Sequence, residues 1–107
     1  MKNIDKLVRN GIPAEIKKEG RRVEFTHYDS FDYVEAILSK ILEETQEVME
    51  ADNIDEVASE VGDLLDIIDA FIDELNIRSD VESKRQEKMK RYGDFSKAVR
   101  LMRAEQV

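Results

Sequence analysis

The chain contains no cysteine, one proline and only four glycines among its 107 residues. Without cysteine, neither a disulfide framework nor a thiolate site can form. The scarcity of glycine and proline, together with a charged fraction of 39 %, favours helices. These three features predict a mainly α fold.

Basic residues are in the minority, because 17 lysines and arginines are set against 25 aspartates and glutamates. The resulting net charge of −8 argues against broad nucleic-acid binding, which requires a basic face toward the phosphate backbone. A small anionic ligand is still compatible with this charge, because a bound metal ion can reverse the local field.

Long apolar runs and an N-terminal signal pattern are also missing, so we expect a cytoplasmic protein without a membrane partner. The hydrophobic fraction of 41 % is too high for a disordered chain of this charge. The length suits one domain, predicted over residues 1–107. Small domains are marginally stable, so association with further copies would help.

Motifs for nucleophilic catalysis and for phosphate-cradling loops are absent as well. His27 is the only histidine, has no visible nucleophile beside it and is interpreted as structural. Serine and threonine are few and lack a nucleophile motif, and no glycine-rich phosphate loop is present. The groups left to carry chemistry are carboxylates and cations.

The first part of the chain predicts a short helix and a short strand. Pro13 suits a first helical turn and Gly20 suits a helix end, which predicts a helix over 14–19. Apolar and polar residues alternate over 22–28, which predicts a strand. Residues 98–102 are a candidate partner strand, and such a two-stranded element must pack on helices to persist.

Three further helices follow from apolar periodicity and capping residues. Ser30 suits the N-cap of a helix over about 31–51, and a second long helix is predicted over about 55–75. Ser79 suits the N-cap of a last helix over roughly 80–91. Because the connections are short, the long helices should pack antiparallel in a helical bundle.

The two long helices carry carboxylates in the same layout. At about 100° per residue, Glu44 lies at one edge of an apolar stripe and Glu47 lies about 60° outward from it. Glu60 and Asp63 repeat this layout on the second helix. A carboxylate at a core edge is costly unless it is paired or binds a metal. Four such oxygen donors suit Mg2+ or Mn2+, so we predict a metal site there.

An ordinary solvated acidic face is the alternative interpretation of these helices. Lys40 is the main cation nearby. Repulsion among four clustered carboxylates would raise their pKa values and destabilise the metal-free protein, and a divalent cation would relieve it. Asp66 could extend the site to a second ion, whereas Asp69 and Asp73 are interpreted as solvated.

Three segments of the chain resemble motifs of one enzyme family. Glu-Glu-x-x-Glu at 43–47, followed by Glu-x-x-Asp at 60–63, resembles the signature of the MazG-like all-α nucleotide pyrophosphohydrolases. This superfamily includes the phosphoribosyl-ATP pyrophosphohydrolases. Residues 6–13 (Lys-Leu-Val-Arg-Asn-Gly-Ile-Pro) resemble the opening of its small house-cleaning branch. Residues 88–95 (Lys-Met-Lys-Arg-Tyr-Gly-Asp-Phe) resemble the basic closing segment of that branch.

The chain departs from the family pattern at two places. The family opening usually reads Arg-Asp-Lys, where this chain has Arg9-Asn10-Gly11. The closing segment often has two glycines before its phenylalanine, and Asp94 replaces one of them here. Both changes leave the acidic motif intact and concern the segments expected to contact substrate.

The resemblance implies Mg2+-dependent cleavage of a nucleoside triphosphate between its α and β phosphates, giving a nucleoside monophosphate and pyrophosphate. It implies that the metal ligands are Glu44, Glu47, Glu60 and Asp63. Glu43 is then the candidate to orient or deprotonate the attacking water. The candidate polyphosphate contacts are Lys6, Arg9, Lys88 and Arg91. For each of these four cations, simple solvation is the alternative.

Two other functions stay open at this point. The phosphoribosyl-ATP step of histidine biosynthesis shares the chemistry, although the opening motif favours house-cleaning of modified or unwanted nucleotides. A non-catalytic acidic helical module that binds metal or a basic partner is the second alternative. Convergence of the four candidate cations on the acidic motif would favour catalysis on an anion.

Apolar residues on the second long helix cover more of its circumference than a lone packing of three helices requires. Ile54, Ala58 and Ile67 add to its main stripe. A helix that is apolar over a wide arc tends to be buried on several sides. We therefore predict a homodimer or homotetramer, which the family resemblance also implies.

Overall fold

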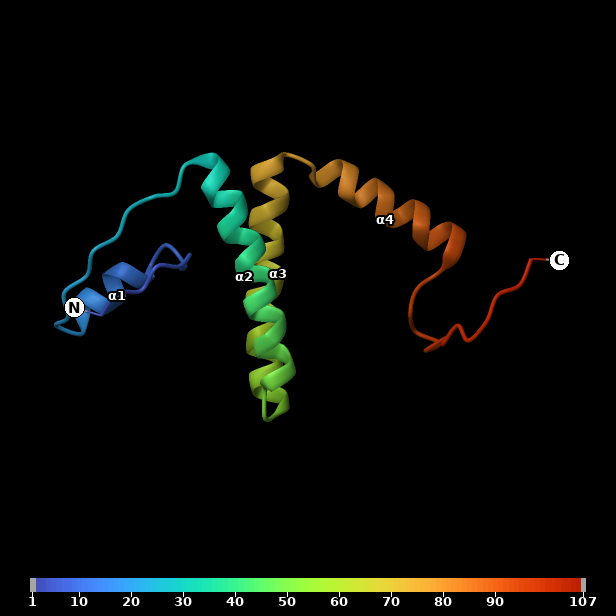
Figure 1. Cartoon of the computed structure of the whole chain (residues 1–107), viewed down its shortest axis with the longest axis horizontal. Coiled ribbons are helices and arrows are strands. Elements are labelled where there is room, and N and C mark those ends of the chain that lie inside the picture. The colour runs from blue at the N-terminus through green and yellow to red at the C-terminus, as the bar shows by residue number, and fades with distance from the viewer. Residues whose placement is uncertain (1, 107) are drawn as a thin grey trace. The chain divides into compact units, whose positions relative to one another are not determined.

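The computed structural model describes residues 2–106, in which four helices and no strand are present. The helices are α1 (Ile12–Lys18), α2 (Ser30–Glu50), α3 (Ile54–Leu75) and α4 (Arg78–Tyr92) (Figure 1). The predicted mainly α class is confirmed. None of these four helices combines the length and hydrophobicity that a membrane span needs. The chain divides into two compact units, and the boundary in the sequence lies between Asn76 and Ile77.

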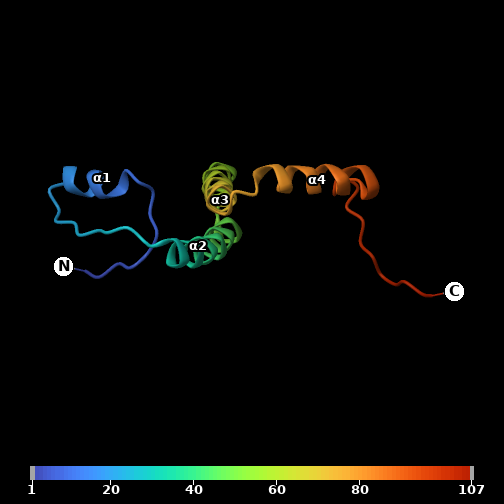
Figure 2. The same ribbon diagram turned by 90° about the horizontal axis from the view of Figure 1, so that it is seen from above.

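In the first unit, α2 and α3 pack side by side as an antiparallel hairpin (Figures 1 and 2). The connection between them is short, because α2 ends at Glu50 and α3 begins at Ile54. The Asn53 side chain accepts a hydrogen bond from the Glu56 N–H at 2.9 Å, and the Glu56 carboxylate accepts one from the Asp52 N–H at 2.8 Å. These two bonds satisfy backbone donors at and just before the start of α3. The antiparallel pair is thus shown, whereas a larger bundle stays a prediction.

Other helix ends follow local chemistry with one correction at α2. The N-cap is Asp29, whose side chain accepts from the Asp32 N–H at 2.8 Å. The prediction of Ser30 as the cap was wrong by one residue, because two capping-competent side chains are adjacent there. At the far end of α3, Asn76 adopts the left-handed conformation with φ of 54°, which asparagine tolerates better than most residues.

The hairpin buries part of each apolar stripe and leaves the rest exposed. Ile37 is completely buried and Ile72 is 8 % exposed, whereas Leu42 is 73 % and Leu65 58 % exposed. On α2, the stripe runs from about 20° to 160° around the helix when Glu44 is set at zero. Its exposed members lie at the end remote from Glu44. We call the exposed set the apolar face: Leu38, Leu42, Met49, Val61, Leu65 and Ile68.

The predicted two-stranded element is wrong. Neither 22–28 nor 98–102 forms a strand, and the two segments belong to different units. Phe25 is 64 % exposed and Val99 is 85 % exposed, so neither side chain is packed against a helix as the prediction required. A two-stranded piece without such packing does not repay its ordering entropy.

The second unit contains α4, in which no residue is buried. This helix begins at Arg78, and its N-cap residue Ile77 makes no side-chain capping bond. The prediction of Ser79 as the cap was therefore wrong, since Ser79 lies within the helix. At the other end, Gly93 has a φ of 80° and its N–H donates to the Met89 carbonyl at 2.9 Å. Glycine suits this position because it adopts positive φ without a steric penalty.

Candidate metal centre

The α2–α3 hairpin brings the predicted carboxylates of both helices together. Oxygen atoms of Glu44, Glu60 and Asp63 all lie within 4.8 Å of one another, and the same is true of Glu43, Glu44 and Glu47. Glu44 belongs to both trios. Glu47 also lies close enough to Glu60 to raise its pKa. Residues three apart lie on one helix face, so the antiparallel pairing places both motifs at the same level of the hairpin.

Two carboxylate oxygens in this cluster are buried without a hydrogen-bond donor. Glu44 is only 4 % exposed. Among the described residues, no group donates to Glu44 Oε2 or to Glu60 Oε2. A buried acceptor without a partner is costly, and a buried negative charge more so. The two oxygens therefore present a place where a cation would be stabilised.

The proximity of the carboxylates alters their proton affinities. The pKa of Glu60 is raised to about 7, chiefly because its carboxyl shares a hydrogen bond with Glu47, and further because of burial and of Glu44. The pKa of Glu44 is also raised, first by burial and then by the negative charge of Glu47. Near neutral pH, Glu60 is thus partly protonated, and a metal ion would displace that proton.

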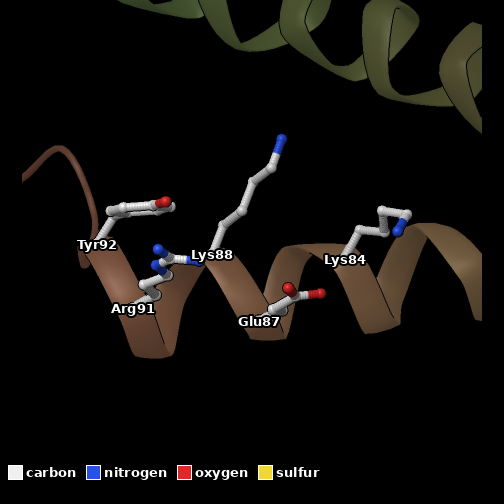
Figure 3. A pocket seen from close by; sticks show the side chains of 5 residues that line it. All are labelled: Lys84, Glu87, Lys88, Arg91 and Tyr92. Atoms are coloured by element: carbon white, nitrogen blue, oxygen red, sulfur yellow. The ribbon is translucent and has the colours of Figure 1, made fainter.

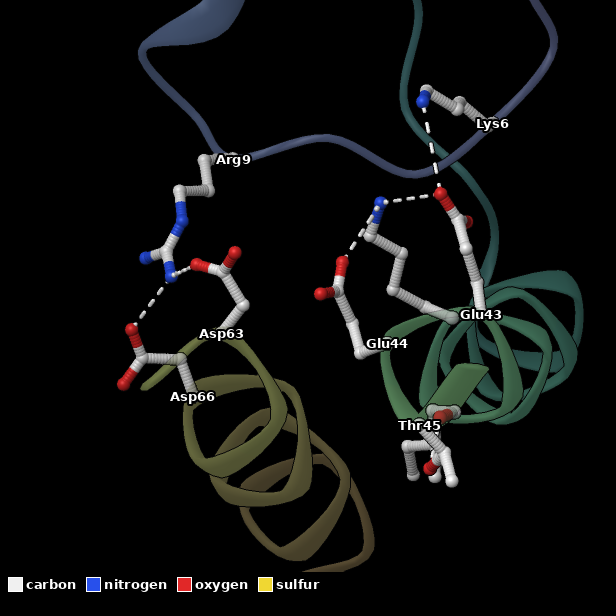
Figure 4. A network of polar contacts seen from close by, with 9 residues as sticks. Lys6, Arg9, Glu43, Glu44, Thr45, Asp63 and Asp66 are labelled. Carbon is white, nitrogen blue, oxygen red and sulfur yellow. Dashed lines mark hydrogen bonds and ion pairs between the residues drawn. The ribbon is translucent and has the colours of Figure 1, made fainter. Parts of the chain in front are cut away.

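Two lysines neutralise part of the cluster on its α2 side (Figure 4). Lys40 Nζ lies 3.5 Å from Glu43 Oε1 and 3.5 Å from Glu44 Oε1. Lys6 Nζ lies 3.8 Å from the same Glu43 oxygen. The Glu43 carboxylate is thereby held between two ammonium groups. Lys40 was not among the predicted site residues, although its spacing of three and four from the two glutamates already favoured such pairs.

On the α3 side, Arg9 contacts two aspartates (Figure 4). Its Nη2 atom donates to Asp63 Oδ1 at 2.6 Å and to Asp66 Oδ2 at 2.8 Å. These contacts raise the pKa of the Arg9 guanidinium, with Asp63 as the largest cause. Sequence analysis predicted a substrate contact for Arg9, and the structure places it on a predicted metal ligand and on Asp66.

The remaining predicted cations, Lys88 and Arg91, lie on α4 in the second unit. With Lys84, Glu87 and Tyr92 they line a shallow hollow along the helix (Figure 3). The Arg91 guanidinium carbon lies 5.1 Å from the centre of the Tyr92 ring, a cation–π distance. One face of α4 thus carries three cations at successive turns.

The donor set of the hairpin fits a hard divalent cation. All of its candidate ligand atoms are carboxylate oxygens, and such oxygens are preferred by Mg2+ and Mn2+ over softer donors. Comparison of the chain with protein-family models, with curated proteins and with solved structures finds no match.

Proposed function

We propose that the protein is a metal-dependent nucleotide pyrophosphohydrolase, with Mg2+ as the cation and Mn2+ as a substitute. One observation carries the proposal. Glu44 is buried, belongs to both acidic trios and has one oxygen without a donor. A solvated acidic face does not require a carboxylate in such a position. The ligands would be Glu44, Glu47, Glu60 and Asp63.

The reaction splits the bond between the α and β phosphates of a nucleoside triphosphate, modified or unwanted nucleotides being the proposed substrates. A cation bound to these carboxylates would neutralise phosphate charge and lower the pKa of a bound water. Glu43 is the proposed group that orients this water and accepts its proton. Lys6 and Lys40 lie within ion-pair distance of the Glu43 carboxylate and favour its charged form. The water oxygen forms a bond to one of these two phosphorus atoms, and the bond from that phosphorus to the bridging oxygen breaks. The bridging oxygen leaves with the other phosphorus, so the products are a nucleoside monophosphate and pyrophosphate.

Positive charge beside the carboxylates supports an anionic substrate. Lys6 and Arg9, two of the four predicted phosphate contacts, reach the acidic cluster from the N-terminal segment. A guanidinium binds phosphate through paired hydrogen bonds, whereas an ammonium acts as a point charge. Lys88 and Arg91 are likewise proposed as phosphate contacts, and both lie on the face of α4 that carries three cations.

We further propose that the functional form is a homodimer or homotetramer in which a second copy covers the apolar face. The exposed residues of this face lie on α2 and α3 in each copy, so two copies related by a twofold axis would form a four-helix bundle. A two-helix hairpin alone leaves much of its apolar surface in water, which favours association.

The test is pyrophosphate release from a panel of ordinary and modified nucleoside triphosphates with Mg2+ or Mn2+. We expect metal-dependent release that Glu44→Gln and Asp63→Asn reduce by a factor on the order of 10² or more. Glu35→Gln is the matched control, because it removes one exposed carboxylate from α2 outside both trios.

If no nucleoside triphosphate in the panel releases pyrophosphate, two further results separate the alternative functions. Release from phosphoribosyl-ATP alone would assign the protein to the histidine-pathway chemistry. Metal binding without release from any nucleotide would instead support a non-catalytic acidic module. Equal activity in Glu44→Gln and Glu35→Gln would contradict the proposed centre.

A further inference from the structure

The contact between Arg9 and Asp63 bears on how metal and substrate binding are connected. Asp63 forms one of the acidic trios with Glu44 and Glu60, and its Oδ1 atom is the one that Arg9 holds at 2.6 Å. The same guanidinium nitrogen also holds Asp66. A positive side chain thus already lies on a proposed metal ligand (Figure 4).

We infer that Arg9 competes with the divalent cation for Asp63, and that cation binding transfers Arg9 to the phosphates of the substrate. This inference rests on the proposed function. It adds that Arg9 is a substrate-binding residue whose availability depends on the metal. The chemical class that it would recognise is a pyrophosphate-containing anion.

Competition follows from the charges and from the atoms involved. A guanidinium and a divalent cation repel each other, and both would draw on the single negative charge of the Asp63 carboxylate. Among the described residues, the Arg9 side chain contacts Asp63 and Asp66 but none of the other proposed ligands, so the deeper carboxylates of the trio are open to a cation while Arg9 still holds Asp63. Exchange at Asp63 is then the step at which the two cations meet.

The Arg9 side chain is able to exchange while its backbone stays in place. Its side chain is 58 % exposed, so its ion pairs are weakened by solvent and are readily replaced. Its backbone carbonyl accepts a hydrogen bond from the Ile12 N–H at 3.0 Å, which fixes it at the start of α1. Released from Asp63, the guanidinium remains beside the centre and has the fork geometry that matches phosphate.

The experiment compares the full-length wild type, Arg9→Gln and the control Arg21→Gln by calorimetric titration with Mn2+. Arg21 lies in the same unit and pairs with Glu19 at 3.1 Å, away from the trios. We expect Arg9→Gln to bind Mn2+ roughly three- to fivefold more tightly, as loss of an exposed ion pair implies. Arg21→Gln should match the wild type.

The second titration adds inorganic pyrophosphate to each protein saturated with Mn2+. We expect Arg9→Gln to bind it several-fold more weakly than Arg21→Gln. A purely structural role for Arg9 would weaken both ligands together, so opposite changes for metal and pyrophosphate are the distinguishing result. Changes of the same sign, or metal affinity equal to that of Arg21→Gln, would overturn the inference.

The failure of the inference can be told apart from failure of the proposed function. If the wild type binds Mn2+ and Glu44→Gln does not, the metal centre stands, and only the comparison of the two arginine variants decides on Arg9. If neither the wild type nor Arg9→Gln binds Mn2+, both proposals fall. Nitrogen NMR of the Arg9 guanidinium gives a separate readout, with a shift expected on adding Mg2+ to the wild type but not to Glu44→Gln.

Discussion

At the scale of single residues, the acidic cluster is most informative through Glu60. Its pKa of about 7 lies above the ordinary value of 4.5, because Glu47 and Glu44 lie close and because of burial. Between pH 4.5 and about 7, Glu60 therefore keeps its proton in the folded protein but has lost it in the unfolded chain. In that interval the unfolded state binds fewer protons, so the free energy of unfolding falls as pH rises.

The first prediction follows from this fall in the free energy of unfolding with rising pH. The metal-free wild type should lose stability relative to Glu60→Gln as pH rises from about 4.5 to about 7, and the difference should then stay constant. Urea unfolding of both proteins across this range, with a chelator present, measures it. A difference that is flat with pH, or one that grows in favour of the wild type, would contradict the shifted pKa.

A second prediction concerns proton release on metal binding. A metal ion binds the carboxylate form, so Mn2+ binding at pH 6 should release close to one proton from Glu60, and affinity should rise with pH up to about 7. Calorimetry in buffers of different ionisation enthalpy counts the protons. Release should vanish at pH 8.5, which provides the internal control.

At the scale of helices, the antiparallel pair depends on a narrow packed edge. Ile37 is fully buried and Leu42, five residues on in the same helix, is 73 % exposed. Ile37→Ala should therefore cost about 2–4 kcal/mol of unfolding free energy, because it removes packed methylenes and leaves a cavity. Leu42→Ala is the matched control in dilute protein and should cost well under about 1 kcal/mol. Chemical denaturation of both variants decides the matter.

The helices also show which features of the sequence were predictive. The position of Glu44 and Glu60 at the edges of two apolar stripes correctly anticipated that α2 and α3 bring them together. Residue spacing was sufficient here because it fixes which side chains share a helix face. The strand predicted over 22–28 failed because alternation describes a face but not the partner that must cover it.

Contacts between remote parts of the chain were beyond prediction from residue spacing. Arg9 and Asp63 are separated by 54 residues, and no local periodicity links a coil segment to a helix face. The sequence singled out both residues but for different partners. Lys40 is the opposite case, since its contacts lie within one helix turn and its spacing was sufficient to predict them.

At the scale of the whole molecule, exposure of the apolar face is the basis for the proposed association. Introducing a charge there should be unfavourable only when a second copy covers it. We expect Leu42→Glu and Leu65→Glu to shift the protein toward monomer, and Val99→Glu, which alters an exposed residue outside the helices, to leave its mass unchanged. Sedimentation at micromolar concentrations measures this. A wild type that is monomeric throughout would refute the association.

The position of the apolar face relative to Glu44 has a consequence for cooperativity in metal binding between copies. On α2, Leu38, Leu42 and Met49 lie at the end of the stripe remote from Glu44, so a copy bound against them would leave the Glu44 carboxylate uncovered. Each centre would then be built from the acidic residues of one chain. Metal occupancy of one copy would change no ligand of the next, and titration of the assembly with Mn2+ should follow a simple hyperbola with a Hill coefficient of about one.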